Sequence, residues 1–315
     1  MIEAKIVKKV IVMLPIKTYI QHPNLLGIAL LKHFGGWIPD KSYLQLRFRL
    51  EMGQRLNLDH PKSFSEKIQW LKLHDRQPDY TIMVDKVKVK NYVASIIGRE
   101  YIIPTLGVWD KPEDIDWDSL PNSFVLKTNH CGGSTGVIIC KNKASFDRTK
   151  AISILKTSLR AKNYPNFREW PYKNVEQKVL AEEYIGPTHD YEDLLDYKFF
   201  CFNGEPIYCQ VISGREKGMC IDFFDQKWNH QPFHEPSNYP FASKELVKPN
   251  NFEKMWQSAR KIAEGKSFVR VDFYDVGNKA LFGEITFYPT SGMGGFSPSE
   301  WDIKLGELIH LPECK

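Results

Sequence analysis

Residues 124–137 read FVLKTNHCGGSTGV and decide the fold, because they join an apolar strand, a lysine and a glycine-rich loop. The apolar run predicts a buried strand that ends at Lys127, which fixes one positive charge at the strand end. The loop that follows has glycines at Gly132, Gly133 and Gly136. Glycines allow backbone N–H groups to turn inward on a phosphate. A strand that resumes at Val137 predicts a loop between two antiparallel strands.

This loop matches two known motifs only in part. The P-loop sequence G-x-x-x-x-G-K-[ST] is absent, and a P-loop also runs from a strand into a helix. Residues 132–136 fit the G-x-S-x-G of serine hydrolases, but that motif needs a helix directly after its serine. Because a second strand follows here, we exclude a nucleophile elbow. A phosphate-binding loop and a flexible hairpin tip remain the two interpretations.

Two strands in the C-terminal part of the chain each carry one carboxylate in an apolar sequence. Residues 268–274 read FVRVDFY and residues 281–289 read LFGEITFYP. An unpaired charge would be costly to bury there, so Asp272 and Glu284 are candidate Mg²⁺ ligands beside nucleotide phosphates. Arg270 projects to the same face as Asp272 and suits a transferring phosphoryl group. The alternative is an Arg–Asp pair on a solvated sheet face.

Strands in hairpins alternate with a few helices, which predicts an α+β fold rather than a regular βαβ array. Apolar spacing predicts helices over residues 43–52, 65–74, 82–97, 145–162 and 252–264, the third ending at Gly98. Strands are expected over residues 123–126, 137–140, 179–185, 197–202, 206–212, 267–274 and 280–287, with a hairpin turn at Asn203–Gly204. Residues 229–250 predict a loop or insertion. We divide the chain into a mostly helical region, 1–80, and a second region, 81–315.

The composition describes an ordinary globular chain, with 42% hydrophobic and 26% charged residues among 315. We expect a cytoplasmic protein, because no apolar run could span a bilayer and no signal-peptide cleavage site follows the basic N-terminus. Six single cysteines predict free thiols. A net charge of +5, spread along the whole chain, suits anionic small molecules better than nucleic acid. The first forty residues either pack as a helix or make a peripheral contact with membrane-bound, lipid-linked sugars.

The order of these features resembles the ATP-grasp fold, in which two α+β lobes hold ATP between them. Three runs are similar to the TupA-like ATP-grasp family, named for teichuronopeptide biosynthesis: residues 61–72 (PKSFSEKIQWLK), 196–199 (DYKF) and 283–289 (GEITFYP). The resemblance extends from Tyr43 to Pro312. It implies an ATP-grasp fold with a mostly helical N-terminal region, and ATP and Mg²⁺ as cofactors.

The resemblance also implies a role for each candidate residue. The nucleotide phosphates would be held by Lys86 and Lys127 and covered by the loop residues Gly132, Gly133, Ser134 and Gly136. The adenine hinge would consist of Glu182, Glu183, Tyr184 and Ile185. Lys198 would face the phosphates, and Arg270 would stabilise the charge of both chemical steps.

Metal binding would fall to Asp272 and Glu284. Thr286 stands where ATP-grasp ligases usually carry asparagine, so it is a candidate third metal ligand. The sequence does not choose the ribose ligand among Asp190, Glu192 and Asp193.

The implied activity is an ATP-dependent carboxylate–amine ligase that works through an acyl phosphate. Relatives belong to polysaccharide assembly, so the expected substrates are a uronic acid of a surface polysaccharide or its precursor and an amino compound. A glycosyltransferase is the alternative, because Asp114-Ile115-Asp116 matches its D-x-D metal motif. A kinase is disfavoured because H-R-D and D-F-G motifs are absent. A sugar-binding module would need the aromatic residues but not Lys127, Asp272 and Glu284 together.

Overall fold

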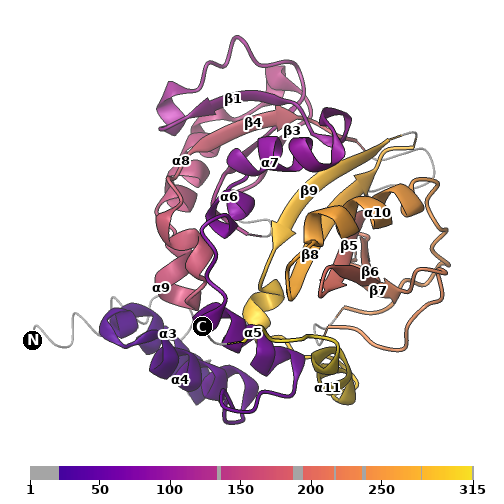
Figure 1. Cartoon of the computed structure of the whole chain (residues 1–315). Helices are drawn as coiled ribbons and strands as arrows, with labels where there is room; N and C mark the ends of the chain where they lie inside the picture. Colours follow the sequence, from indigo (N-terminus) through magenta and orange to yellow (C-terminus); the bar gives the residue numbers. More distant parts are fainter. Residues whose placement is uncertain are drawn as a thin grey trace, which may run out of the picture.

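The computed structural model describes residues 21–132, 136–186, 194–215, 218–235, 239–277 and 279–313. Two antiparallel sheets, each with its own hydrophobic core, organise these residues (Figure 1). The four-stranded sheet has the order β1-β4-β2-β3, and the five-stranded sheet has the order β7-β6-β5-β8-β9. Helices pack around both sheets, so the predicted α+β class is confirmed.

Seven of the described strands lie where the sequence predicts them, within a few residues at each end. The smaller sheet contains β1 (Thr105–Trp109), β2 (Phe124–Thr128), β3 (Ile138–Cys140) and β4 (Val179–Glu183). The larger sheet contains β5 (Asp196–Phe202), β6 (Glu205–Ser213), β7 (Cys220–Phe224), β8 (Phe268–Asp275) and β9 (Ala280–Thr286). Strands β1 and β7 were not predicted. Both are five-residue edge strands, and β1 also carries a register shift between Thr105 and Gly107.

The two predicted turns between strands are confirmed. The hairpin of β5 and β6 turns at Asn203 and Gly204, whose φ angles of 51° and 88° are those that asparagine and glycine adopt at least cost. Strands β2 and β3 pair antiparallel, with Leu126 opposite Ile138. The glycine-rich segment therefore connects two strands, and the nucleophile elbow is excluded as expected.

The described helices are α3 (Pro23–Phe34), α4 (Asp40–Met52), α5 (Phe64–His74), α6 (Tyr80–Val84), α7 (Lys88–Ile97), α8 (Arg148–Leu159), α9 (Asn163–Phe167), α10 (Phe252–Ala263) and α11 (Glu300–Glu307). Some helices, such as α8 and α10, pack on the sheets, whereas α3 and α4 lie at one edge of the molecule (Figure 1). Short 3₁₀ turns include η1 (Gly35–Trp37), η2 (Arg99–Tyr101), η3 (Pro112–Asp114), η4 (Lys143–Ser145), η5 (Trp170–Asn174) and η6 (Pro289–Gly292). Helix α10 lies over the larger sheet, where the ring of Phe252 packs 5.7 Å from that of Phe199 on β5.

The single helix predicted over residues 82–97 is wrong, because Asp85 and the residues beside it break it into α6 and α7. The Asp85 carboxylate accepts hydrogen bonds from the backbone N–H of Val87 (2.9 Å) and from the side-chain amide of Asn129 (3.0 Å). The backbone N–H of Lys86 donates to the Asn129 carbonyl instead of to the helix. A short polar side chain that competes for backbone donors favours such a break. The predicted stop at Gly98 is confirmed.

The helical N-terminal region shares the core of the larger sheet. Helix α5 begins with a capping box, in which Ser63 and Glu66 exchange side chain and backbone hydrogen bonds. Its first residue, Phe64, packs edge-on against Phe268 of β8 (4.9 Å) and Phe296 (5.3 Å). The division at residue 80 stays a prediction.

Three further expectations concern the described residues. Residues 229–235 and 239–250 form neither a helix nor a strand, in agreement with the predicted loop. The five described cysteines are free thiols. Among the described helices, none has the length and apolar character that crossing a bilayer requires.

Candidate functional site

The break between α6 and α7 directs Lys86 toward the larger sheet. Its Nζ lies 2.7 Å from a carboxylate oxygen of Glu284 on β9 and also donates to the Cys131 carbonyl at 2.5 Å. One lysine thus connects the segment after β2 with the carboxylate of β9. Burial and the charge of Asp272 act to raise the pKa of Glu284, but Lys86 and Arg270 together outweigh them, so the pKa lies below its usual value.

Lys127 and Glu182 meet on the smaller sheet. Val125 lies opposite Glu182 in the pairing of β2 with β4, so Lys127, two residues on, is diagonal to Glu182 on the same face. The two form an ion pair, and Lys90 of α7 binds the second Glu182 oxygen at 2.7 Å. Burial opposes ionisation of Glu182, but both lysines outweigh it and lower its pKa. Glu182 is therefore an ionised, buried carboxylate.

Asp272 on β8 is the centre of the second charged cluster. Arg270 binds both of its carboxylate oxygens, with Nε at 2.7 Å and an outer nitrogen at 2.8 Å, and Lys198 of β5 forms a further ion pair. Lys198 lies directly opposite Asp272 in the register. Burial acts to raise the pKa of Asp272, but Arg270 and Lys198 outweigh it, so the pKa is lowered. The alternative interpretation, that Arg270 and Asp272 pair on a solvated sheet face, is wrong because Asp272 is only 3% exposed.

The two candidate metal ligands face each other across a strand pair. Asp272 lies opposite Glu284, and Arg270 lies opposite Thr286, in the antiparallel register of β8 and β9. An outer nitrogen of Arg270 also donates to the Thr286 hydroxyl at 3.1 Å. Among the described residues, no group of three or more His, Cys, Asp and Glu side chains is arranged to hold a metal ion. Any metal here would therefore take two carboxylates and complete its shell with other oxygens.

Four further charged residues join these clusters and were missed in the sequence: Lys90, Asp196, Arg215 and Glu235. Asp196 lies 3.6 Å from Lys198 and accepts from Arg215 at 2.5 Å. A period-two reading of β5 would have found Asp196, because residues 196 and 198 share one sheet face.

Glu235 follows the isolated bridge between His234 and Ser297. Burial raises the pKa of Glu235, while the charge of Arg270 opposes that change. No local pattern in its loop marks Glu235 as a site residue.

The predicted phosphate loop is described only at its two ends, since Gly133 and Ser134 lie outside the described residues. Gly132 is exposed. Gly136 has a φ of 73°, and a side chain there would collide with the Ser158 hydroxyl. The close approach to α8 therefore requires glycine at this position.

Cys131 begins this loop in a cluster of polar groups that the sequence analysis did not use. Its sulfur lies 3.5 Å from His130 Nε2 and accepts from the Ser158 hydroxyl at 3.3 Å. Burial acts against ionisation of the Cys131 thiol, but hydrogen bonds with His130, Ser158 and Thr128 outweigh it and lower the pKa to about 7.

The predicted adenine hinge lies at the end of β4. Glu183 is exposed at the last position of the strand, and Tyr184 and Ile185 follow it half-buried. Within the described part of the chain, Glu182 is the member of this group that forms an ion pair with another predicted site residue, Lys127. The candidate ribose ligands Asp190, Glu192 and Asp193 lie outside the described residues.

The turn that follows β9 is held from α5. Thr290 and Ser291 have φ angles of 47° and 57°, an uncommon conformation for residues with side chains. Gln69 donates to the Ser291 carbonyl at 2.9 Å, and Lys72 donates to the same carbonyl at 2.8 Å and to the Ser291 hydroxyl at 2.7 Å. Burial lowers the pKa of Lys72 to about 8, and Glu169 partly opposes that change. The run at residues 61–72 thus supplies polar contacts to the turn beside the metal-ligand strand.

The D-x-D sequence at residues 114–116 has a structural explanation. A carboxylate oxygen of Asp116 accepts from the backbone N–H groups of Asp118 (3.2 Å) and Ser119 (3.4 Å), as in an Asx turn. Ile115 between the two aspartates is buried in the core of the smaller sheet. No described contact joins Asp114 or Asp116 to the clusters above.

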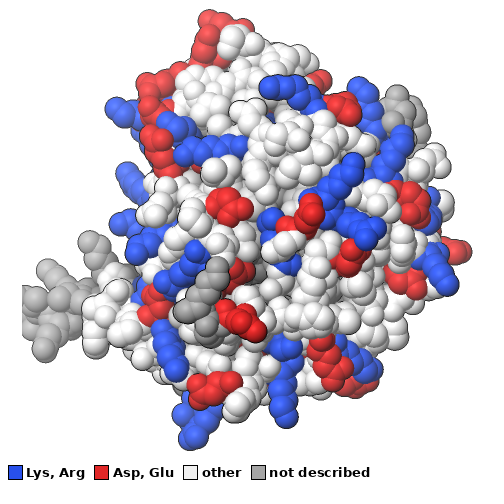
Figure 2. All heavy atoms as spheres, in the orientation of Figure 1, with Lys and Arg blue, Asp and Glu red and all other residues white. Residues whose placement is uncertain are grey.

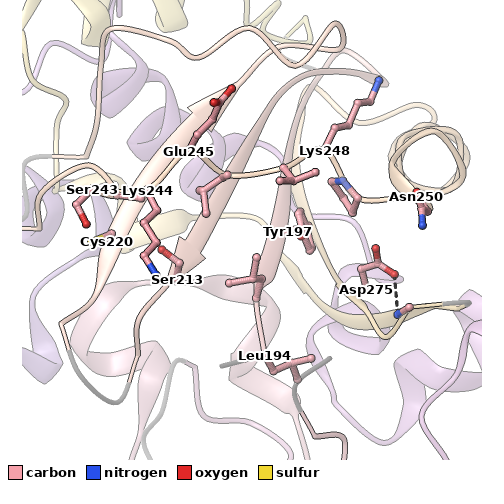
Figure 3. Close-up of a pocket in the computed structure, with 16 residues that line it drawn as sticks. Leu194, Tyr197, Ser213, Cys220, Ser243, Lys244, Glu245, Lys248, Asn250 and Asp275 are labelled. Atoms are coloured by element: carbon pink, nitrogen blue, oxygen red, sulfur yellow. Dashed lines mark hydrogen bonds between the residues drawn. The ribbon is translucent and has the colours of Figure 1, made fainter. Parts of the chain in front are cut away.

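A cavity of about 640 Å³ lies on the other face of the larger sheet (Figure 3). Tyr197 and Asp275 line it. Their sequence neighbours Lys198 and Tyr274 lie on the same sheet face as Asp272, so Tyr197 and Asp275 lie on the opposite face. Lys248 and Asn250, from the loop before α10, line another part of it (Figure 3). This cavity is therefore separate from the charged clusters.

Comparison with known proteins identifies a family. The family model described as TupA-like ATPgrasp matches residues 66–310. No curated protein matches the chain. A solved D-alanine–D-alanine ligase from Helicobacter pylori has 13% identity and a TM-score of 0.42, over 79% of this chain and 70% of that one.

Two other solved structures resemble the chain to a similar degree. A RimK domain ATP-grasp protein from Sphaerobacter thermophilus DSM 20745 has 12% identity and a TM-score of 0.38, over 75% of this chain and 70% of that one. A D-alanine–D-alanine ligase from Bacillus anthracis, complexed with ATP, has 16% identity and a TM-score of 0.38, over 73% of this chain and 68% of that one.

Proposed function

The chain belongs to the TupA-like ATP-grasp family, and from this premise we propose that it is an ATP-dependent carboxylate–amine ligase. The observation that carries the proposal is the cross-strand pair of ionised carboxylates, Asp272 and Glu284, surrounded by Lys86, Lys198 and Arg270. A site that brings a metal–nucleotide complex to an anionic substrate needs fixed charges of both signs.

Nucleotide binding would exchange the ion pairs of this site. Lys86 now neutralises Glu284, and Lys127 now neutralises Glu182. Phosphates would take over the two lysines, while Glu182 would accept from the adenine amine beside the backbone of residues 183–185. Gly132, Gly133, Ser134 and Gly136 would close over the phosphates and exclude water. Lys86 and Lys127 would thus have two roles. Without nucleotide they keep Glu284 and Glu182 ionised, and with nucleotide they would bind the phosphates.

Mg²⁺ fits the donor set of the larger sheet. Magnesium is usually bound by one or two carboxylates together with substrate phosphates and water. Asp272 and Glu284 are both held ionised and lie opposite each other, and the Thr286 hydroxyl lies on the same strand as Glu284. The ion would supply charge neutralisation between the carboxylates and the phosphates.

Arg270 and Lys198 would then act on the charge that moves during the reaction. A substrate carboxylate oxygen attacks the γ-phosphorus of ATP, the bond to ADP breaks, and an acyl phosphate forms. An amine then attacks the acyl carbon, loses a proton, and expels inorganic phosphate, which leaves an amide. Arg270, fixed by two hydrogen bonds to Asp272, would stabilise negative charge in both steps.

The substrates that we propose are a uronic acid of a surface polysaccharide, or of its precursor, and an amino compound. This choice rests on the family alone, whose name refers to teichuronopeptide. We propose that the reaction takes place in the cytoplasm, where ATP is supplied.

The test is an ADP-release assay against a matrix of uronic acids and amino acids, with hydroxylamine added in a parallel series. A ligase releases ADP only with a carboxylate, and hydroxylamine captures its acyl phosphate as a hydroxamate. ADP release with a stable phosphorylated sugar and no hydroxamate would identify a kinase. Transfer of sugar from a nucleotide sugar, without ADP release from ATP, would overturn the proposal.

A further inference from the structure

Helices α3 and α4, with the turn η1 between them, expose an unusual group of apolar side chains. Leu30, Phe34, Trp37 and Leu46 are 42%, 48%, 83% and 45% exposed. Steps of four and three residues along α3 and η1 place Leu30, Phe34 and Trp37 on one side of the chain. We call these four residues the apolar face.

The apolar face points away from the rest of the protein. Leu44 and Phe48 of α4 are fully buried in the main core, whereas Leu46, two positions from each, lies on the opposite side of the helix. Leu31 and Gly35 are buried between the two helices, because a side chain at Gly35 would meet Tyr43. Helices α3 and α4 lie at one edge of the molecule, far from the strand β1 at the other end (Figure 1).

The exposed charges of helices α3 and α4 are mostly positive. Arg49, three positions from Leu46, lies beside the apolar face, whereas Lys32, two positions from both Leu30 and Phe34, lies on the opposite side of α3. Lys32, Lys41 and Arg49 are exposed, and the only carboxylates within residues 21–53 are Asp40 and Glu51. Asp40 forms ion pairs with Arg76 and Arg168, and Glu51 pairs with Arg47. The outer surface of the two helices therefore keeps an excess of cationic side chains. On the face seen in Figure 2 both signs are interspersed, so the positive excess is a property of the two helices' composition and not of one uniform patch.

We propose that this apolar face docks on the surface of an anionic phospholipid membrane. Exposed aromatic and aliphatic side chains enter the boundary between headgroups and acyl chains, and Arg49 beside Leu46 contacts an anionic headgroup. The other basic residues of the two helices add attraction to the negative membrane surface over about a Debye length. The charge also selects against a second copy of the chain as occupant, because two cationic surfaces would repel each other.

In the sequence, residues 1–20 lie on the N-terminal side of α3 and carry Lys5, Lys8, Lys9 and Lys17 against one carboxylate, Glu3. The sequence on the N-terminal side of the face thus has the same charge preference. The proposal does not depend on the proposed ligase function, because it uses none of the residues of that site.

The test is flotation of the full chain with vesicles of equal parts phosphatidylglycerol and phosphatidylcholine, compared with vesicles of phosphatidylcholine alone. The wild-type chain should float with the anionic vesicles at low salt and be released by high salt. The double variant Phe34→Ser, Trp37→Ser should lower the partition coefficient by about tenfold or more. The control Ile139→Ser removes a side chain that is 51% exposed on β3 and should not change flotation.

Circular dichroism and Mg-ATP calorimetry show whether the double variant keeps its fold and nucleotide site, as the proposal expects. Absence of wild-type flotation would overturn the proposal. Equal flotation of wild type and double variant would also overturn it, since residues 1–20 would then account for binding. A monomer–dimer equilibrium that the double variant abolishes, without vesicle binding, would assign the face to a second copy instead.

Discussion

Lys86 and Glu284 form an ion pair of 2.7 Å between residues that are 198 positions apart in the chain. The pair joins the break between α6 and α7 to the strand that faces Asp272. Lys86 lies within the break that interrupts the helix predicted over residues 82–97. We propose that this ion pair opens on nucleotide binding, when Mg²⁺ binds Glu284 and a nucleotide phosphate binds Lys86.

Glu284→Gln should separate metal binding from nucleotide binding. The amide cannot hold Mg²⁺ as a carboxylate does, but it releases Lys86 for the phosphates. We expect ATP binding without metal to be kept or strengthened, and the increase in affinity that Mg²⁺ gives to be lost, as measured by calorimetry. Lys86→Met should instead raise the Kd for ATP about tenfold or more, the scale of one charge-assisted hydrogen bond. Equal effects of both variants on metal-free ATP would contradict the exchange of partners.

Thr286→Val tests whether the hydroxyl beside Glu284 binds the metal. Valine keeps the β-branched shape and removes only the oxygen that now accepts from Arg270. We expect the Mg²⁺ concentration for half-maximal ADP release to rise severalfold, which corresponds to a loss of about 1 kcal/mol or less in the free energy of metal binding. Thr157→Val on α8 removes a hydroxyl that binds only within its helix and is the matched control. An unchanged Mg²⁺ dependence would show that Thr286 is not a metal ligand and contacts only Arg270 and its packing neighbours.

The polar contacts from α5 predict a positioning role for Lys72. Lys72→Met removes the contacts to the Ser291 carbonyl and hydroxyl, which fix the left-handed turn after β9. A misplacement of about 1 Å near reacting groups can cost about 100-fold in rate. We expect kcat for ADP release to fall at least tenfold while the Kd for Mg-ATP stays within about threefold. Lys67→Met, which removes one contact to the Ile309 carbonyl, should leave kcat unchanged. A lower melting temperature with normal kcat would assign Lys72 to stability alone.

The lowered pKa of Cys131 predicts a pH-dependent stability. The thiol has a pKa of about 7 in the folded chain and a higher one, about 8.5, when unfolded. The folded state therefore binds fewer protons between these values, and stability should rise as pH rises from 7 toward 9. Relative to Cys131→Ser, the wild-type free energy of unfolding should increase over this range by about 1–2 kcal/mol. Denaturant titrations at pH 6.5 and 8.5 measure it, and a constant difference would show that the thiolate is not favoured.

Much of the fold follows from local patterns. Short apolar runs mark the central strands, the Asn203–Gly204 pair marks the hairpin of β5 and β6, and Ser63 with Glu66 marks the start of α5. The edge strand β1 escaped because a bulge interrupts its alternation. The break at Asp85 escaped because its cause, a hydrogen bond from Asn129, comes from 44 residues away.

Some residues of the candidate site could likewise be predicted from local sequence patterns, and others could not. Asp272, Glu284 and Arg270 stand out as charges in apolar strands, and β8 and β9 bring them together. Lys90 and Glu235 carry no such signal, since one lies on an amphipathic helix and the other in a loop. Only the packing of α7 and the bridge at His234 bring them near the charged clusters.

Calorimetric titration of Mg-ATP without saccharide tests most directly whether Lys127 and Asp272 belong to a Mg-ATP site. The titrations compare the wild-type chain with the variants Lys127→Ala, Asp272→Asn and Asp114→Asn. We predict micromolar to millimolar binding by the wild type, kept by Asp114→Asn and weakened at least about tenfold in the other two variants. Circular dichroism of each variant separates loss of the site from loss of the fold. Binding of a nucleotide sugar but not of Mg-ATP by the wild type, with loss in Asp114→Asn, would contradict the account.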